Sequence, residues 1–151
     1  GEAIVVTQEV DDIISSPVVK ESIINAYDNA VRYTDGVLAG LVKRLKARTD
    51  IDAGFVYVSD HGESLGEGGL YLHGAPYFMA PSEQIRVPMV MWLSKDWSRT
   101  FGFDAANLAR EPAGGVTHEH LYSTVLGMLG VQSTTRRPRW DLTDNRSSAA
   151  Q

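Results

Sequence analysis

A short glycine-rich segment holds most of the side chains in this sequence that could do chemistry. Asp60 and His61 are adjacent, Gly62 follows them, and His73 lies twelve positions after His61, so two of the four histidines share one segment. A carboxylate beside an imidazole offers one hard and one borderline ligand, a mixture that zinc accepts. Gly62 would let the backbone turn sharply enough for both side chains to face one ion. An Asp-His-Gly triplet alone is more often a turn, and the nearby His73 shifts the balance toward a metal site.

Two apolar runs on either side of this segment predict the strands that position it. Residues 53–59 and 87–93 are mostly apolar, as is typical of strands buried in a sheet. Helix, strand, loop, strand and helix follow one another, an order that indicates a layered α/β fold with parallel pairing. Ligands of open α/β sheets bind beyond the carboxyl ends of strands, and the segment with Asp60 leaves such an end. We therefore expect 53–59 and 87–93 to be neighbouring parallel strands.

Two amphipathic patterns predict the helices of the fold. The first covers Pro17–Arg48, with hydroxyl side chains just before the proline and an apolar stripe at three-, four- and seven-residue steps. We expect this helix to pack on the central sheet. The second pattern covers His118–Leu129 and stops at Gly130. His118 itself is best explained as a helix-start or surface residue.

Length and composition limit the classes of protein that the sequence can represent. With 151 residues, 43% of them hydrophobic and 22% charged, the chain is expected to form one globular domain over 1–151. Residues 134–151, with their four arginines, are expected to be a flexible tail. A net charge of −5 argues against nucleic-acid binding, and no apolar run approaches the roughly 18 residues of a membrane span. The absence of cysteine excludes a disulfide scaffold and a thiolate zinc site.

Four motifs occur in order between about Ile24 and Val131. They are Tyr27-Asp28-Asn29, Ser59-Asp60-His61-Gly62-Glu63-Ser64-Leu65-Gly66-Glu67, Leu70-Tyr71-Leu72-His73-Gly74-Ala75-Pro76-Tyr77 and Val87-Pro88-Met89. Together they resemble the catalytic domain of lipid A phosphoethanolamine transferases. These are membrane-anchored, zinc-dependent enzymes of the alkaline phosphatase/sulfatase superfamily, and they include the mobile colistin-resistance enzymes. The extended loop motif is far more specific than Asp-His-Gly, which the whole superfamily shares.

The resemblance implies a fold, a reaction and roles for particular residues. The fold would be part of a layered α/β/α domain with a mainly parallel central sheet. The reaction would be zinc-dependent transfer of phosphoethanolamine from a phospholipid to lipid A or another cell-surface phosphate, through a covalent threonine intermediate. Asp60 and His61 match two ligands of the catalytic Zn²⁺, and His73 matches a histidine that contacts the phosphoryl group or a second zinc. We expect Glu63 and Glu67 to support the ligands or to face solvent, because two more carboxylates would overfill one ion.

The same resemblance implies a place in the cell and further parts of the enzyme. The members of this group are held in the bacterial inner membrane by an N-terminal region, their catalytic domain faces the periplasm, and their lipid A modification is linked to polymyxin resistance. Their threonine nucleophile and a glutamate zinc ligand lie upstream of the segment matched here, and neither Thr7 nor Thr34 stands in a matching motif. We therefore expect this chain to be the C-terminal part of the catalytic domain and to be inactive by itself.

Two other interpretations stay open on the sequence alone. A sulfatase or phosphodiesterase-type hydrolase would reuse the same Asp60–His61 pair, although the Leu70–Gly74 motif favours a transferase. A catalytically incompetent fragment would bind metal weakly and transfer nothing, an interpretation that the missing upstream motifs favour for this chain. The acceptor of the transferred group also stays open. So does the reason for the lack of cysteines, since related domains commonly carry disulfides.

Overall fold

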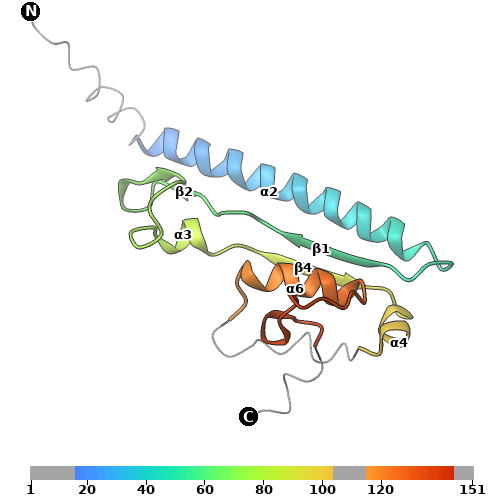
Figure 1. Ribbon diagram of the computed structural model, residues 1–151. Coiled ribbons are helices and arrows are strands. Elements are labelled where there is room, and N and C mark those ends of the chain that lie inside the picture. Colours follow the sequence, from blue (N-terminus) through green and yellow to red (C-terminus); the bar gives the residue numbers. More distant parts are fainter. Residues whose placement is uncertain (1–15, 104–114, 145–151) are drawn as a thin grey trace, which may run out of the picture. The chain divides into compact units, whose positions relative to one another are not determined.

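The described chain combines one long helix with several short helices and short strands. The computed structural model describes residues 16–103 and 115–144 (Figure 1). In chain order the elements are α2 (Pro17–Lys46), β1 (Gly54–Val58), β2 (Ser64–Leu65), η1 (Glu67–Gly69), β3 (Tyr71–Leu72), α3 (Ser82–Ile85), β4 (Met89–Leu93), α4 (Trp97–Phe101), α6 (Glu119–Met128) and η2 (Pro138–Trp140). None of the helices in these two ranges combines the length and the apolar character that a bilayer-crossing segment requires.

Helix α2 begins where the sequence indicates. The Ser16 hydroxyl accepts a hydrogen bond from the Val19 backbone N–H at 3.4 Å, and Pro17 takes the first helical position, where a backbone donor is not needed. The helix ends at Lys46, two residues before the predicted end at Arg48. The predicted long helix is therefore confirmed.

Helix α2 has no fully buried residue, and one stripe along it is half-buried, namely Val19, Ile23, Ile24, Leu38, Val42 and Leu45, so its packing on a sheet stays a prediction. Several of its large apolar side chains are exposed, namely Val18, Tyr27, Val31, Tyr33, Val37 and Leu41.

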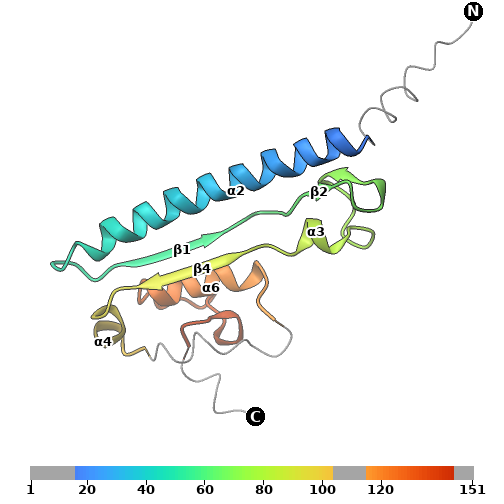
Figure 2. The same cartoon turned by 180° about the vertical axis from the view of Figure 1, so that it is seen from behind.

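Strands β1 and β4 are neighbours, as predicted, but they run antiparallel and not parallel (Figure 2). The Ser59 N–H donates to the Pro88 carbonyl at 3.3 Å, and the Ser94 N–H donates to the Ala53 carbonyl at 2.8 Å. The partner's number therefore falls as β1 advances, which is the register of an antiparallel pair. A parallel pair would need a connection that carries the chain back to the starting end of β1. Residues 59–88 instead leave and return at the same end, which explains why the predicted direction is wrong.

The described residues divide into two compact units. The first unit comprises 16–44 and 56–90, and the second comprises 45–55, 91–103 and 115–144. The predicted chemical segment lies entirely in the first unit.

A small aromatic core stabilises the second unit. Trp97 is almost fully buried, stacks on Phe101 with ring centroids 4.9 Å apart, and meets Phe103 edge to face at 5.6 Å. Ala53 and Met128 are the other buried apolar residues described there. Such offset and edge-to-face aromatic pairs add to the stabilisation that burial of their area provides.

Helix α6 confirms the second predicted helix and ends at the predicted glycine. Gly130 has φ 64°, its N–H donates to the Gly127 carbonyl at 3.0 Å, and the Val131 N–H donates to the Leu126 carbonyl at 2.9 Å. These two hydrogen bonds form a Schellman motif, whose left-handed residue is usually glycine. His118 stands at the N-cap position and is exposed, and its side chain makes no capping hydrogen bond.

Residues 134–144 pack against α6, so the prediction of a flexible tail is wrong for this stretch. The Arg137 N–H donates to the Ser123 hydroxyl at 3.0 Å, and the Leu142 N–H donates to the Thr124 hydroxyl at 3.0 Å. Both hydroxyls belong to buried residues of α6. The helix therefore holds the segment by polar contacts, and an apolar pattern would not reveal them.

A buried ion pair joins two residues of the same stretch, Arg136 and Asp141. Arg136 donates from Nε and from Nη2 to Asp141 Oδ2, both at 2.6 Å. Thr143 donates to Asp141 Oδ1 from its backbone N–H at 2.8 Å and from its hydroxyl at 2.6 Å. The Asp141 side chain is fully buried and that of Arg136 is 17% exposed, so this arginine of the expected tail has a structural role. Residues 145–151, the rest of that tail, lie outside the described residues.

Candidate functional site

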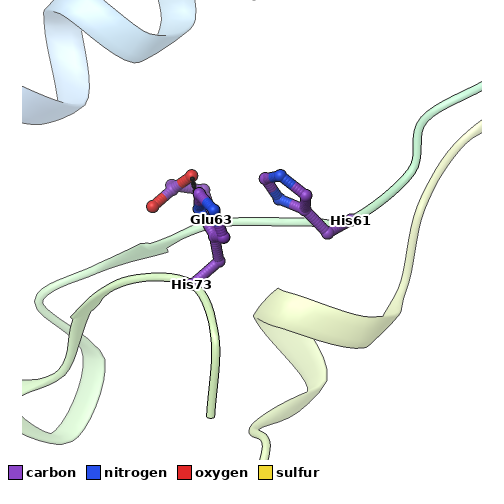
Figure 3. A group of neighbouring side chains, drawn as sticks. All are labelled: His61, Glu63 and His73. Carbon is purple, nitrogen blue, oxygen red and sulfur yellow. Dashed lines mark hydrogen bonds and ion pairs between the residues drawn. The ribbon is translucent and has the colours of Figure 1, made fainter.

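Three side chains from the segment after β1 form one cluster. The rings of His61 and His73 are stacked with their centroids 3.7 Å apart, and His73 Nδ1 lies 3.0 Å from Glu63 Oε2 (Figure 3). One potential ligand atom from each of the three lies within 4.8 Å of the others. The structure thus brings together the two histidines that the sequence singles out.

Asp60 lies at the edge of this cluster. Its carboxylate is 90% exposed, and Oδ2 is 3.9 Å from His61 Nε2. The two members of the predicted metal pair are therefore near each other, but Asp60 is not one of the three clustered residues.

Glu63 was expected to support the ligands or to face solvent, and in the structure its carboxylate supports the His73 ring. Its side chain is 20% exposed, and it contacts His73 directly. Glu67 is exposed, as expected. Hydrogen bonds from its own backbone N–H and from that of Leu65 hold the pKa of its carboxyl below the usual value.

A two-stranded hairpin returns the chain so that His73 meets Glu63. Strands β2 and β3 pair antiparallel, with Ser64 opposite Leu72 and Leu65 opposite Tyr71. Leu72 has φ 64°, a left-handed conformation that costs a non-glycine residue of order 1–2 kcal/mol. The residue immediately before His73 therefore stores backbone strain, which fixes the direction in which the chain enters His73.

Close packing of two backbone segments holds the stretch that carries His61 and Glu63. The Gly62 N–H donates to the Gln84 carbonyl in α3 at 2.9 Å. A Cβ atom at position 62 would overlap the carbonyl oxygen of Glu83 and lie 3.3 Å from that of Arg86. Only glycine allows this approach, so Gly62 serves close contact between two segments, and the turn predicted there stays a prediction.

Hydrogen bonds at Nδ1 fix the orientation of both imidazole rings. His61 Nδ1 is 2.9 Å from the Gly62 carbonyl, which can only accept, so Nδ1 is the donor and Nε2 is the nitrogen that the neutral ring would offer to a metal. Glu63 acts in the same way on His73 Nδ1. Hydrogen bonds of this kind orient metal-binding histidines in proteins. Glu63 Oε1 is buried and has no hydrogen-bond partner among the described residues, and such an atom is costly unless a ligand satisfies it. The group of donors therefore fits a divalent ion such as zinc.

The hydroxyl groups near the site are already engaged. Ser59 donates to the His61 carbonyl at 2.9 Å, and the buried Ser64 hydroxyl accepts a hydrogen bond from Gln84 at 2.9 Å. Thr34 lies in the middle of α2, and Thr7 lies outside the described residues.

The remaining described histidines belong to the second unit. His120 is buried, its Nδ1 lies 3.1 Å from the Thr117 N–H, and its ring meets Trp140 edge to face at 4.9 Å. These contacts indicate a structural role for His120.

Comparison with known proteins relates the chain to a family. The sulfatase family model matches residues 6–131. Phosphoethanolamine transferase EptA of Salmonella typhimurium is 45% identical over 117 residues, which are 76% of this chain and 21% of that protein. Phosphatidylethanolamine transferase Mcr-1 of Escherichia coli is 38% identical over 120 residues, 79% of this chain and 21% of that protein. The chain thus spans about a fifth of the length of these curated relatives.

Solved structures give the same picture for the fold. The soluble domain of lipooligosaccharide phosphoethanolamine transferase A from Neisseria meningitidis matches with a TM-score of 0.77 and 43% identity, over 83% of this chain and 38% of that one. The C-terminal periplasmic domain of EptC from Campylobacter jejuni matches with a TM-score of 0.71 and 39% identity, over 84% of this chain and 39% of that one. The fold is therefore part of an alkaline phosphatase/sulfatase-like α/β domain, as the motifs predict.

Proposed function

The chain belongs to the sulfatase family, and we propose that it forms part of a metal-dependent phosphoethanolamine transferase. The observation that carries this proposal is the His61–Glu63–His73 cluster, with Asp60 beside it, in the segment whose motifs point to such enzymes. The names of the relatives support it, because proteins 38–45% identical to this chain are called phosphoethanolamine transferases or phosphatidylethanolamine transferases.

We assign the metal to Asp60 and His61, and the phosphoryl group or a second ion to His73. The ion we propose is Zn²⁺, which when bound neutralises charge on phosphoryl oxygens and activates a hydroxyl nucleophile. The backbone carbonyl of Gly62 orients the His61 ring toward the metal. Glu63 holds the proton of His73 on Nδ1, so that Nε2 is free to face an oxygen of the substrate or an ion.

The rest of the reaction is proposed from the relatives. We infer a phospholipid donor, a lipid A-type phosphate acceptor, and a threonine nucleophile supplied by a part of the protein outside this chain. Among the relatives, one is named a Kdo(2)-lipid A phosphoethanolamine 7''-transferase, and a solved one is described as an integral membrane protein. We accordingly place the parent protein in the inner membrane, with this part facing the periplasm and with lipid A modification as a route to polymyxin resistance.

A sulfatase-type hydrolase is the second candidate, because the matching family model is that of the sulfatases. Water, and not a lipid, would then be the acceptor of the group that is cleaved at the same cluster. Mass spectrometry of lipid A from cells that express the whole protein separates the two candidates. A transferase adds phosphoethanolamine to lipid A, and a hydrolase does not.

Zinc is expected to bind the chain, and the double substitution Asp60→Ala, His61→Ala is expected to weaken binding by at least about 100-fold, because it removes two of the proposed ligands. Isothermal titration measures the affinity and whether one or two ions bind. His118→Ala is the matched control, since it removes an exposed imidazole from the second unit and should leave the affinity unchanged. Equal zinc affinity in the native chain and the double variant would contradict the metal assignment.

A further inference from the structure

Gln84 is a buried polar residue to which the proposed chemistry gives no role. We propose that Gln84 is a positioning residue. It holds the arm of the loop that carries His61 and Glu63 to the arm that carries His73, so that the three side chains stay clustered. The inference rests on the proposed function for its meaning, since the cluster it holds is the proposed metal and phosphoryl site.

Three hydrogen bonds converge on Gln84 from two separate stretches of the loop. Gln84 is only 8% exposed. Its side chain donates from Nε2 to the Ser64 hydroxyl at 2.9 Å. Its Oε1 accepts from the Ala75 N–H at 3.3 Å. Its backbone carbonyl accepts from the Gly62 N–H at 2.9 Å. Both polar ends of the amide are thus used, in a place where an unpaired polar group would be costly.

The residues that Gln84 binds are chain neighbours of the residues in the cluster. Gly62 lies between His61 and Glu63, and Ser64 follows Glu63 directly. Ala75 lies two positions after His73 on the returning arm. Gln84 therefore ties the arm that carries His61 and Glu63 to the arm that carries His73.

The other contacts between the two arms are too slight to hold the cluster without help. Strands β2 and β3 have two residues each, and an isolated hairpin is marginal even when it is longer. The direct contact between His73 and Glu63 is a single hydrogen bond to an imidazole that is 49% exposed, where water competes with it. The buried amide of Gln84 thus adds a tie between the arms that is shielded from water.

The experiment compares metal binding in the 151-residue chain and in Gln84→Met. Methionine keeps the length and the apolar bulk of the side chain but removes its donor and its acceptor, and the backbone bond to Gly62 can still form. Co²⁺ serves as the probe because its visible absorption reports the geometry of its ligands. We expect Gln84→Met to lower Co²⁺ affinity on the order of 10- to 100-fold and to change the spectrum of the bound ion. The control Gln132→Met, at an exposed glutamine of the second unit, should alter neither.

Two further variants separate positioning from general stability. Gln84→Glu keeps an acceptor for the Ala75 N–H and can accept from the Ser64 hydroxyl, although it buries a carboxylate, so its spectrum should lie closer to the native one than that of Gln84→Met. Ser64→Ala removes a single hydrogen bond and should give an intermediate loss of affinity; these two variants decide the question if Gln84→Met does not fold. A native Co²⁺ spectrum and affinity in Gln84→Met, or in Ser64→Ala, with only a lower unfolding temperature would overturn the inference.

Failure of the proposed function gives a different result. In that case the native chain itself binds no Co²⁺, and the nuclear Overhauser effect between the His61 and His73 rings becomes the readout. Its loss in Gln84→Met, in protein that is folded, still supports a positioning role. Its retention overturns that role.

Discussion

Replacing Gly62 with alanine is expected to abolish useful metal binding by the chain, with zinc affinity falling by about 100-fold although no proposed ligand is altered. The added methyl group would overlap the carbonyl oxygen of Glu83, which belongs to backbone and cannot rotate away. Either α3 or the arm that carries His61 must then move, and such overpacking typically costs about 1–3 kcal/mol of stability.

The same displacement acts on both functions of Gly62. Its N–H would lose the bond to Gln84, and its carbonyl, which orients the His61 ring, would shift with it. Isothermal titration measures the loss of zinc affinity, and thermal unfolding measures the loss of stability. Gly36→Ala is the matched control, because a Cβ atom there meets nothing within 4 Å and sits in helix α2. If Gly62→Ala binds zinc as well as Gly36→Ala does, the close approach of the two backbones is not what shapes the site.

Replacing Asp141 with alanine is expected to lower the free energy of unfolding of the second unit by about 3–5 kcal/mol. The substitution leaves the Arg136 guanidinium largely buried without its carboxylate, and it also removes the acceptor of the Thr143 N–H and hydroxyl. Urea unfolding followed by tryptophan fluorescence is the measurement. All three tryptophans, Trp92, Trp97 and Trp140, lie in this unit.

An exposed ion pair provides the comparison for Asp141. Arg48 donates to both oxygens of Asp50 at 2.7 Å and holds the pKa of that carboxyl below its usual value, yet both side chains are well exposed. Asp50→Ala should leave the urea midpoint unchanged, because water replaces such a pair at little cost. The double substitution Arg136→Met, Asp141→Leu should recover part of the loss, since no charge is then left buried. Equal midpoints for Asp141→Ala and Asp50→Ala would show that burial adds nothing to the pair.

The sequence predicted the strands but not their relative direction, for a reason that lies in the connection between them. An apolar run looks the same in a parallel and in an antiparallel neighbour. The direction depends on where residues 59–88 return, and that depends on the Ser59–Pro88 contact between positions far apart in the sequence. Helices α2 and α6 were easier to predict, because caps such as Ser16 and stops such as Gly130 act locally.

In the candidate site, too, local patterns could be predicted and contacts between distant positions could not. His61 and His73 stand out because chemically active residue types recur within one short segment. Gln84 does not, because a glutamine after a loop carries no pattern that predicts burial against Ser64 and Ala75. Similarly, the polar residues Ser123 and Thr124 gave no sign that they would hold the segment expected to be a tail.

Because β1 and β4 pair antiparallel, the segment that carries the site starts and ends at the same end of the strand pair. The chain leaves the pair at Ser59 and re-enters it at Pro88, two residues joined by a hydrogen bond. The clustered side chains, the β2–β3 hairpin and Gln84 all lie between these two residues. Both ends of the segment are thus fixed by the same strand pair, and Lys20 of α2 adds a third point of attachment by donating to the Gly66 carbonyl at 3.3 Å. A change in the spacing of β1 and β4 would therefore be transmitted to both arms of the site at once.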